Sequence, residues 1–288
     1  MAGTPTLWSG PNRFYSHGQH ALFYQAWIPS HPQRMVVGLH GAGQHSGWFE
    51  PLATRLIVHG LAVYALDLRG FGRSSGVRGH VDCFDQYLDD VDAVISRINQ
   101  RHPGIPIILL GHSLGGIVAI RYAQERSAPI RALVVSAPAL RPRMVIPPLV
   151  EAVILMMSRI APMTSIDVTK WSAVLFRDLP RYDQNVVQTG HQGDPWNTTR
   201  FSVRWFHELL IHGQHALHQA HHLQLPVLSF CSTDDGLVDP WAVHQFYHAL
   251  PGPNKKHVML CQKPHDWILY PNETDPLYTD ILRWMKTQ

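Results

Sequence analysis

The stretch Ile105-Pro106-Ile107-Ile108-Leu109-Leu110-Gly111-His112-Ser113-Leu114-Gly115-Gly116 places a serine in the pattern G-x-S-x-G directly after an apolar run. That run is short and rich in β-branched residues, which is typical of a strand buried on both faces. Helical spacing follows the serine, in Leu114, Ile117, Val118 and Tyr122. Because glycine has no Cβ, Gly111 and Gly115 allow a sharp, strained turn with Ser113 at its apex. The pattern predicts a nucleophilic hydroxyl at residue 113.

Chance alone supplies such a motif in about one chain in ten of this length, so an ordinary surface serine in a glycine-rich turn is the alternative interpretation. A neutral serine hydroxyl attacks slowly unless a general base takes its proton and a carboxylate holds that base in the right tautomer. The remainder of the chain must therefore supply a histidine and an acid.

Composition limits the possible classes of protein. The chain has 288 residues, of which 45% are hydrophobic, and no change in composition marks a second domain, so we expect a single domain over residues 1–288. A net charge of +3 without a long run of lysine or arginine argues against a nucleic-acid partner.

The cysteines and the N-terminal segment indicate the cellular compartment. Three cysteines without C-x-x-C spacing fit a reducing compartment better than a disulfide framework. The first residues lack the basic start and continuous apolar core of a secretory signal. These features predict a cytoplasmic protein, with contact at the membrane periphery if its surface is apolar enough.

Strand-like runs alternate with helical patterns along most of the chain. The clearest helix covers residues 84–98, where apolar and acidic residues take opposite faces. This alternation predicts an α/β fold with a mostly parallel sheet, helices on both faces and ligand binding beyond the carboxyl ends of the strands. The expected strands are residues 35–40, 61–67, 105–110, 130–136, 225–232 and 256–262.

The alternation breaks over residues 138–199, which we interpret as an inserted helical cap, or lid. Residues 144–163 are too apolar for a solvated loop, yet prolines and charges interrupt them and they fall short of the ~20 apolar residues of a membrane span. A buried core helix of the main domain is the alternative. An apolar cap predicts a preference for acyl chains and transient contact with lipid surfaces.

Position selects the base and the acid among 20 histidines and several aspartates. In α/β-hydrolase proteins the nucleophile, the acid and the histidine follow in this order, each on a loop after a strand. Asp234 and Asp235 follow the strand at 225–232, and His265 follows the strand at 256–262. We choose Asp235 over Asp234 as the acid. His112, beside the nucleophile, is expected to point away into the scaffold.

The negative charge that develops on an attacked carbonyl needs two backbone N–H donors. Leu114, directly after the nucleophile, supplies the first. The second donor in such folds comes from the loop after an early strand, and Ala42 between two glycines is the best candidate there. The expected oxyanion hole is therefore made by the amides of Ala42 and Leu114.

No metal and no cofactor are predicted. His218 and His222 have the i, i+4 spacing of a metal-binding helix, within a group that also holds His212, His215 and His221, but the general-base glutamate of H-E-x-x-H is missing. We interpret the group as a histidine-rich, partly exposed helix. The glycines at 70, 72 and 76 match neither the P-loop nor the dinucleotide pattern.

Taken together, these segments resemble the monoacylglycerol lipase and lysophospholipase branch of the α/β-hydrolase superfamily, also catalogued with the serine aminopeptidases. The resemblance spans nearly the whole chain, with an acid loop that fits Asp235 and Asp239 and a histidine loop that matches His265. Its other motifs lie at residues 40–47, 67–76, 79–81, 111–116 and 194–195.

The chain departs from the family pattern in its first loop. A glutamate usually follows the second glycine there, with an arginine four residues beyond it, and both help to bind the alcohol group. Gln44 and Trp48 stand at those positions here. We therefore expect Gln44 and Trp48 to contact the substrate at a more apolar entrance.

The resemblance implies a serine hydrolase that cleaves carboxylic esters of acyl lipids through an acyl-enzyme. His265 would take the proton of Ser113, Asp235 would orient the imidazole, and water activated by His265 would release the acid. A general carboxylesterase, or a hydrolase of peptides or lactones on the same fold, is the first alternative. A small-molecule sensor without catalytic activity is the more remote one.

Overall fold

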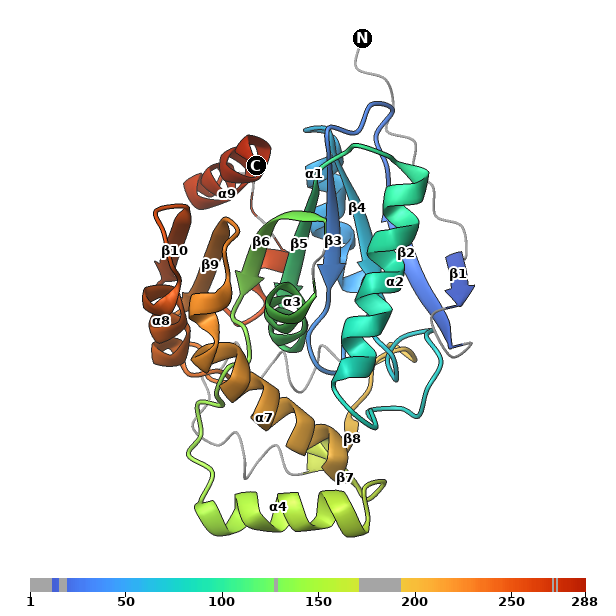
Figure 1. Ribbon diagram of the computed structural model, residues 1–288, viewed down its shortest axis with the longest axis vertical. Helices are drawn as coiled ribbons and strands as arrows, with labels where there is room; N and C mark the ends of the chain where they lie inside the picture. The colour runs from blue at the N-terminus through green and yellow to red at the C-terminus, as the bar shows by residue number, and fades with distance from the viewer. Residues whose placement is uncertain (1–11, 16–19, 127–128, 171–192, 271, 273) are drawn as a thin grey trace.

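The expected strands assemble into one twisted, mostly parallel sheet. The computed structural model describes residues 12–15, 20–126, 129–170, 193–270, 272 and 274–288 (Figure 1). Within these residues the sheet has eight strands in the order β1-β2-β4-β3-β5-β6-β9-β10. Strand β2 is antiparallel to both of its neighbours, and the pairs from β4 to β10 are parallel. Their bounds are β1 Asn12–Tyr15, β2 Ala21–Trp27, β3 Arg34–Leu39, β4 Leu61–Leu66, β5 Ile107–His112, β6 Ile130–Ser136, β9 Val227–Ser232 and β10 Lys255–Leu260.

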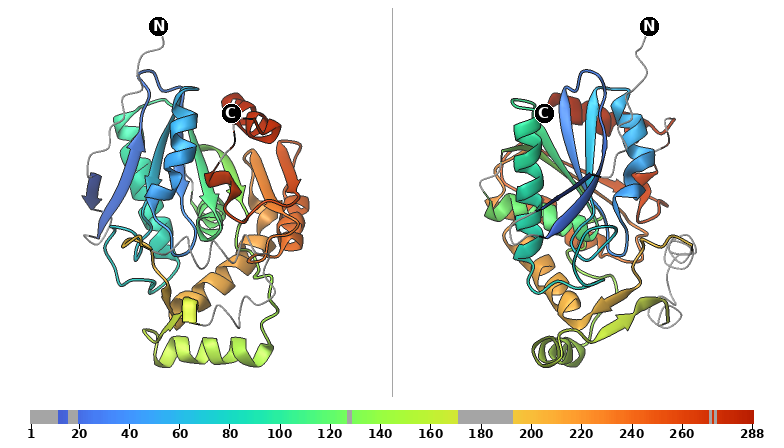
Figure 2. Two further views of the ribbon diagram at one scale, coloured as in Figure 1. Left: turned by 180° about the vertical axis from the view of Figure 1, so that it is seen from behind. Right: turned by 90° about the vertical axis from the view of Figure 1, so that its right-hand side faces the viewer.

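Helices cover both faces of this sheet, as the alternation of strands and helices predicts. Helices α1 and α9 lie on one face and α2, α3 and α8 on the other (Figure 2). Alternate side chains of β5 enter the two layers, Ile107 and Leu109 on the α2 side and Ile108 and Leu110 on the α1 side. The helices are α1 Glu50–Ile57, α2 Asp85–Arg101, α3 Leu114–Glu125, α8 Pro240–Ala249 and α9 Pro276–Thr287. The predicted fold class is confirmed.

The segment between β6 and β9 lies beyond the carboxyl ends of the parallel strands (Figure 1). It contains α4 Pro148–Ile160, a two-stranded sheet of β7 Ser165–Asp167 and β8 Arg200–Ser202, and α7 Val203–His218. Part of the predicted cap, residues 171–192, lies outside the described residues. Only Ser158 of α4 is buried, so this helix belongs to the surface and not to the core.

Helix α7 continues the inserted segment past the predicted boundary at residue 199 and packs between α4 and α3. Among the described helices, none combines the length and the apolarity that crossing a membrane requires.

One carboxylate organises the loops at this end of the sheet. Asp67, at the end of β4, is buried and accepts hydrogen bonds from the amides of Ser46 and Arg73, each at 2.6 Å. These bonds join the loop after β3 to the loop after β4. Gly72 passes so close to Asp67 that a Cβ at residue 72 would overlap the carboxylate, which explains the glycine at a φ of 52°.

A buried ion pair fixes the loop after β4 to α2. The guanidinium of Arg69 donates to both carboxylate oxygens of Asp90, with Nε–Oδ2 at 2.9 Å and Nη2–Oδ1 at 2.7 Å. Both side chains are buried. Two parallel hydrogen bonds of this kind specify geometry as well as supplying energy.

We predict that Asp90→Ala lowers the free energy of unfolding by roughly 3 to 5 kcal/mol, because it leaves the Arg69 charge buried without its partner. Urea unfolding followed by circular dichroism measures this change. The control is Asp89→Ala on the same helix, which breaks the partly exposed pair with Arg126 and should cost less than about 1 kcal/mol. Equal costs for the two variants would contradict the role given to the buried pair.

Candidate active site

Ser113 stands alone between β5 and α3 in a strained backbone conformation. Its φ of 53° and ψ of −114° are rarely adopted by residues other than glycine. The turn is tight enough that a Cβ at Gly111 would overlap the Gly115 carbonyl, and one at Gly115 would overlap the Leu39 carbonyl of β3. Glycine is required at both positions, and the packing lifts the Ser113 side chain clear of its own backbone.

The predicted base and acid lie in contact with each other. His265 Nδ1 is 2.7 Å from Asp235 Oδ2. The other oxygen of Asp235 accepts hydrogen bonds from the amides of Leu237 at 2.9 Å and Val238 at 3.0 Å, so the buried carboxylate is held on both sides. With the proton of the neutral ring on Nδ1, Nε2 is left as the basic nitrogen. His265 and Ser113 line the same cavity.

Asp234, the alternative acid, faces elsewhere. Its Oδ2 accepts hydrogen bonds from the Gln262 amide at 2.9 Å and from the Thr233 hydroxyl at 3.2 Å. Asp234 thus joins the acid loop to the histidine loop, and the structure brings Asp235 to the histidine.

The expectation for His112 was wrong. His112 does not point away into the scaffold: it lines the cavity and its ring centroid lies 4.8 Å from that of His265. Strand β5 runs through residue 112, so the alternation of its side chains places His112 on the face of Ile108 and Leu110. Burial, with a smaller effect from His265, holds the pKa of His112 well below its usual value. His112 is therefore a neutral ring that packs against the base.

The predicted oxyanion donors occupy suitable places. Leu114 is the first residue of α3, so its N–H has no acceptor inside the helix. For Ala42, the orientation of the preceding peptide is fixed by His40. The Leu68 amide donates to His40 Nε2 at 3.0 Å, so the ring proton is on Nδ1, which donates to the Gly41 carbonyl at 2.7 Å. Burial lowers the pKa of His40 to about 4, which keeps the ring neutral.

In a trans peptide the C=O and the following N–H point in opposite directions. Since the Gly41 carbonyl points at His40, the N–H of Ala42 points away from it, and Ala42 lines the cavity that holds Ser113. This geometry supports the prediction that the amides of Ala42 and Leu114 receive the oxyanion.

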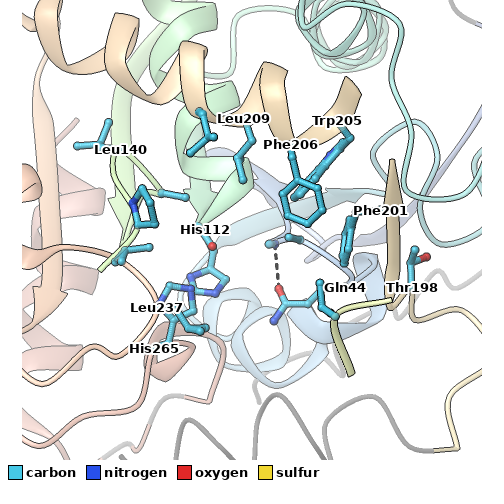
Figure 3. Close-up of a pocket in the computed structure, with 18 residues that line it drawn as sticks. Gln44, His112, Leu140, Thr198, Phe201, Trp205, Phe206, Leu209, Leu237 and His265 are labelled. Atoms are coloured by element: carbon cyan, nitrogen blue, oxygen red, sulfur yellow. Dashed lines mark hydrogen bonds between the residues drawn. The ribbon is translucent and has the colours of Figure 1, made fainter. Parts of the chain in front are cut away.

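The cavity in front of Ser113 has a volume of about 230 Å³ and mostly apolar walls. Phe206 and Leu209 project into it from α7, opposite Gln44 and His265 (Figure 3). Within the described part of the chain its wall contains no aspartate, glutamate, lysine or arginine. The polar lining residues are Gln44, His112, Ser113, Thr198 and His265.

The two residues expected to contact the substrate differ in their placement. Gln44 lines the cavity, and its Oε1 accepts the Gly41 amide at 2.8 Å, which supports the loop that carries Ala42. Trp48 is not part of the cavity wall: its Nε1 donates to Asn197 Oδ1 at 3.1 Å and its ring packs edge-on against Tyr270. The structure thus brings Gln44, but not Trp48, to Ser113.

Several residues that shape the site were not singled out from the sequence for these roles. His45 Nε2 lies 2.8 Å from Asp194 Oδ2, and the Thr198 amide donates to the Gly43 carbonyl at 2.9 Å, so the inserted segment is tied to the oxyanion loop. The signals in the sequence for these contacts are the polar first loop and the motif at residues 194–195. The sequence of α7, which forms the aromatic wall, shows the pattern of any amphipathic helix and does not indicate that this helix lines the cavity.

The histidine-rich segment forms no metal site within the described residues, where no group of three or more histidine, cysteine or acidic side chains could hold an ion. Helix α7 ends at His218 and a 3₁₀ turn, Ala220–His222, follows, so His218 and His222 do not share a helical face. His212 instead stacks on Phe84, with ring centroids 4.1 Å apart.

The sequence also matches a known protein family. Residues 30–273 match the model of the family described as serine aminopeptidase, S33. The chain belongs to this family. It is a serine hydrolase of the α/β-hydrolase superfamily, as the resemblance implied.

Similar proteins include phospholipase YtpA of Bacillus subtilis, 30% identical over 80% of this chain and 87% of its own length. The human monoglyceride lipase is 38% identical over 44% of this chain and 42% of its own length. Among solved structures, the monoacylglycerol lipase of Paleococcus ferrophilus superposes with a TM-score of 0.77 at 27% identity, covering 92% of this chain and 98% of that one.

For this S33-family chain we predict that Asp235→Asn lowers kcat on an acyl ester by about 10⁴-fold, because the imidazole loses the partner that fixes its tautomer. Ser113→Ala should lower kcat on the same ester by roughly five to six orders of magnitude. Steady-state kinetics with a chromogenic ester measure both. The matched control is Asp234→Asn, which keeps an acceptor for Gln262 and should retain near-normal activity. If Asp234→Asn were the damaging change, the acid would be misassigned.

Proposed function

We propose that this protein hydrolyses carboxylic esters of acyl lipids with a small head group, monoacylglycerols foremost and lysophospholipids next, through an acyl-enzyme on Ser113. In this reaction His265 takes the hydroxyl proton, Asp235 stabilises the imidazolium, and the amides of Ala42 and Leu114 hold the oxyanion. The imidazolium then protonates the leaving alcohol. Water activated by His265 hydrolyses the ester of Ser113 and releases the fatty acid.

The observation that carries the proposal is the apolar wall of the catalytic cavity. Trp205, Phe206 and Leu209 of α7 offer a hydrophobic surface next to the nucleophile, which suits an acyl chain. A peptide with a free amino terminus needs a carboxylate to pair with its ammonium group, and the described cavity wall has none. The same wall has no lysine or arginine for a phosphate, so a phosphorylated head group would have to remain outside.

The names of the relatives point the same way, since phospholipase YtpA and the monoglyceride lipases are named for lipid esters. A general carboxylesterase, a peptidase and a lactonase share the catalytic residues and differ in the cavity. Among the described residues, the cavity wall offers neither the charges nor the polar surface that would favour those alternatives.

A substrate panel tests the proposal. Purified protein is assayed with a monoacylglycerol, a lysophosphatidylcholine, a short acetyl ester, a lactone and an aminoacyl p-nitroanilide. We expect kcat/KM to be at least ten times higher for the long-chain monoacylglycerol than for the acetyl ester, since each buried methylene adds favourable transfer free energy. A preference for the aminoacyl anilide, or equal slow rates throughout, would overturn the assignment.

The cap supplies a second element of the proposed function, contact with a lipid surface. Apolar residues on the outer face of α4 recur at i, i+4, i+7 and i+11, with exposed fractions of 77% at Leu149, 46% at Val153, 50% at Met156 and 71% at Ile160. Helix α4, which carries this exposed stripe, lies at the end of the molecule away from the central sheet (Figure 1). An exposed apolar stripe of this kind is typical of helices that lie on a membrane surface.

We predict that replacing both Leu149 and Ile160 by serine reduces binding to phosphatidylcholine vesicles several-fold, measured by flotation, because the stripe loses its two most exposed members. Hydrolysis of a water-soluble ester should not change. Val58→Ser, which alters a residue 66% exposed just after α1, is the matched control and should bind like the parent protein. Undiminished binding by the double variant would remove the cap from this role.

A further inference from the structure

Two sulfur atoms and an imidazole nitrogen meet between β9 and β10, at one edge of the sheet. Met259 of β10 lies opposite Cys231 of β9, and its Sδ is 3.6 Å from the Cys231 Sγ. The Nε2 of His257 lies 2.9 Å from the same Sδ. Alternate residues of a strand share a face, and this face of the two strands is the one that α8 covers (Figure 1). A thiol, a thioether and an imidazole are thus close enough to share one ion.

The imidazole of His257 is held in the orientation of a metal ligand. Its Nδ1 contacts the hydroxyl of Ser229 at 2.8 Å and the carbonyl of Ser229 at 3.2 Å, and the ring of Tyr247 stacks on it. A carbonyl can only accept a hydrogen bond, so it favours the tautomer with the ring proton on Nδ1. In that tautomer Nε2 turns a lone pair toward the Met259 sulfur, which is also an acceptor. Support of one ring nitrogen by a backbone carbonyl is typical of histidines that bind a metal through the other.

The charge and the softness of the three groups select the kind of ion. Burial, with a smaller effect from the charge of Asp235, raises the pKa of Cys231 to about 12, so the thiol keeps its proton until a metal displaces it. A monovalent cation forms a pair with the thiolate that has no net charge, whereas a divalent ion would leave a positive charge buried there. Thiolate and thioether sulfurs favour Cu(I) over harder ions. In the described part of the chain, histidine, cysteine and acidic side chains alone form no group of three that could hold an ion, so the Met259 sulfur is essential.

The spacing of the three atoms fits a shared cation after a small movement of Met259. Two sulfurs bound to one cation at about 2.3 Å each lie roughly 3.5 to 4 Å apart, and the Sγ–Sδ distance of 3.6 Å is within this range. A nitrogen and a sulfur on one cation lie roughly 3.4 Å apart or more, so Sδ must move away from Nε2 by about half an ångström. Met259 is unbranched and 40% exposed on the edge strand, which allows this movement and gives the ion a route of entry.

We propose that Cys231, His257 and Met259 form a binding site for one Cu(I) ion. As the ion enters, the S–H bond of Cys231 breaks and its proton passes to solvent. The Sγ, Nε2 and Sδ atoms then each donate an electron pair to copper, whose oxidation state does not change. None of the three residues lines the catalytic cavity, and copper binding is measured without any ester, so this inference does not depend on the proposed ester hydrolysis.

Competition with a chelator tests the site. Cu(I) is added without oxygen in the presence of bathocuproine disulfonate, whose coloured complex measures the copper that the protein leaves unbound. The reference protein carries Cys83→Ser and Cys261→Ser, because both of these thiols are exposed and would bind copper by themselves. We expect the reference to bind one Cu(I) per chain, and Met259→Leu, which keeps the bulk but removes a ligand, to weaken the affinity at least tenfold. Met144→Leu alters a methionine of similar exposure in the cap and should bind like the reference.

X-ray absorption by the copper-loaded reference protein measures the ligands directly. We expect two sulfurs and one nitrogen bound to copper. Equal affinities of Met259→Leu and the reference would mean adventitious binding by a thiol only, and would overturn the site, as would a reference protein that takes no copper from the chelator. If Met259→Leu fails to fold, as judged by circular dichroism, the absorption spectrum decides: copper with one sulfur ligand or none overturns the proposal.

Discussion

The left-handed backbone of Ser113 is the constraint on which the site depends. A φ of 53° at a residue with a side chain costs free energy, and the surrounding packing must hold it. Gly111 and Gly115 make this possible, because β5, α3 and the end of β3 meet there at distances that exclude a Cβ. The same contacts place Leu114, the first residue of α3, beside the hydroxyl, with an N–H that has no acceptor inside the helix. The proposed nucleophile and the first proposed oxyanion donor are therefore positioned by the same packing contacts.

Two buried polar groups fix the position of the second proposed oxyanion donor, the amide of Ala42. The neutral ring of His40 orients the peptide before Ala42, and the carboxylate of Asp67 holds the loops on either side of it. Neither group needs to touch the substrate. Both act by removing freedom from a loop whose amide must point at a developing charge, which is how preorganised donors lower a barrier. The ion pair of Arg69 with Asp90 then anchors that loop to α2.

The parallel sheet could be predicted from the alternation of strands and helices. The contact between Asp235 and His265 could be predicted because each of these two residues follows a strand, in a fixed order along the chain. His112 was misjudged for a physical reason: β5 extends to residue 112, and alternation then turns its ring toward the loop of His265. Trp48 was expected at the substrate, yet it packs on Tyr270. The wall formed by Phe206 and Leu209 could not be predicted, since an amphipathic helix shows that it has a buried face but not which cavity that face encloses.

The proposed reaction requires that Ser113 is a nucleophile activated by His265, which Asp235 holds in place. The most direct measurement is the rate of covalent labelling by a long-chain fluorophosphonate, with the modified residue located by mass spectrometry. We expect one adduct per chain, on Ser113, and labelling at least a hundredfold slower in Asp235→Asn than in Asp234→Asn. Labelling of another residue, or equal rates in the two variants, would contradict it.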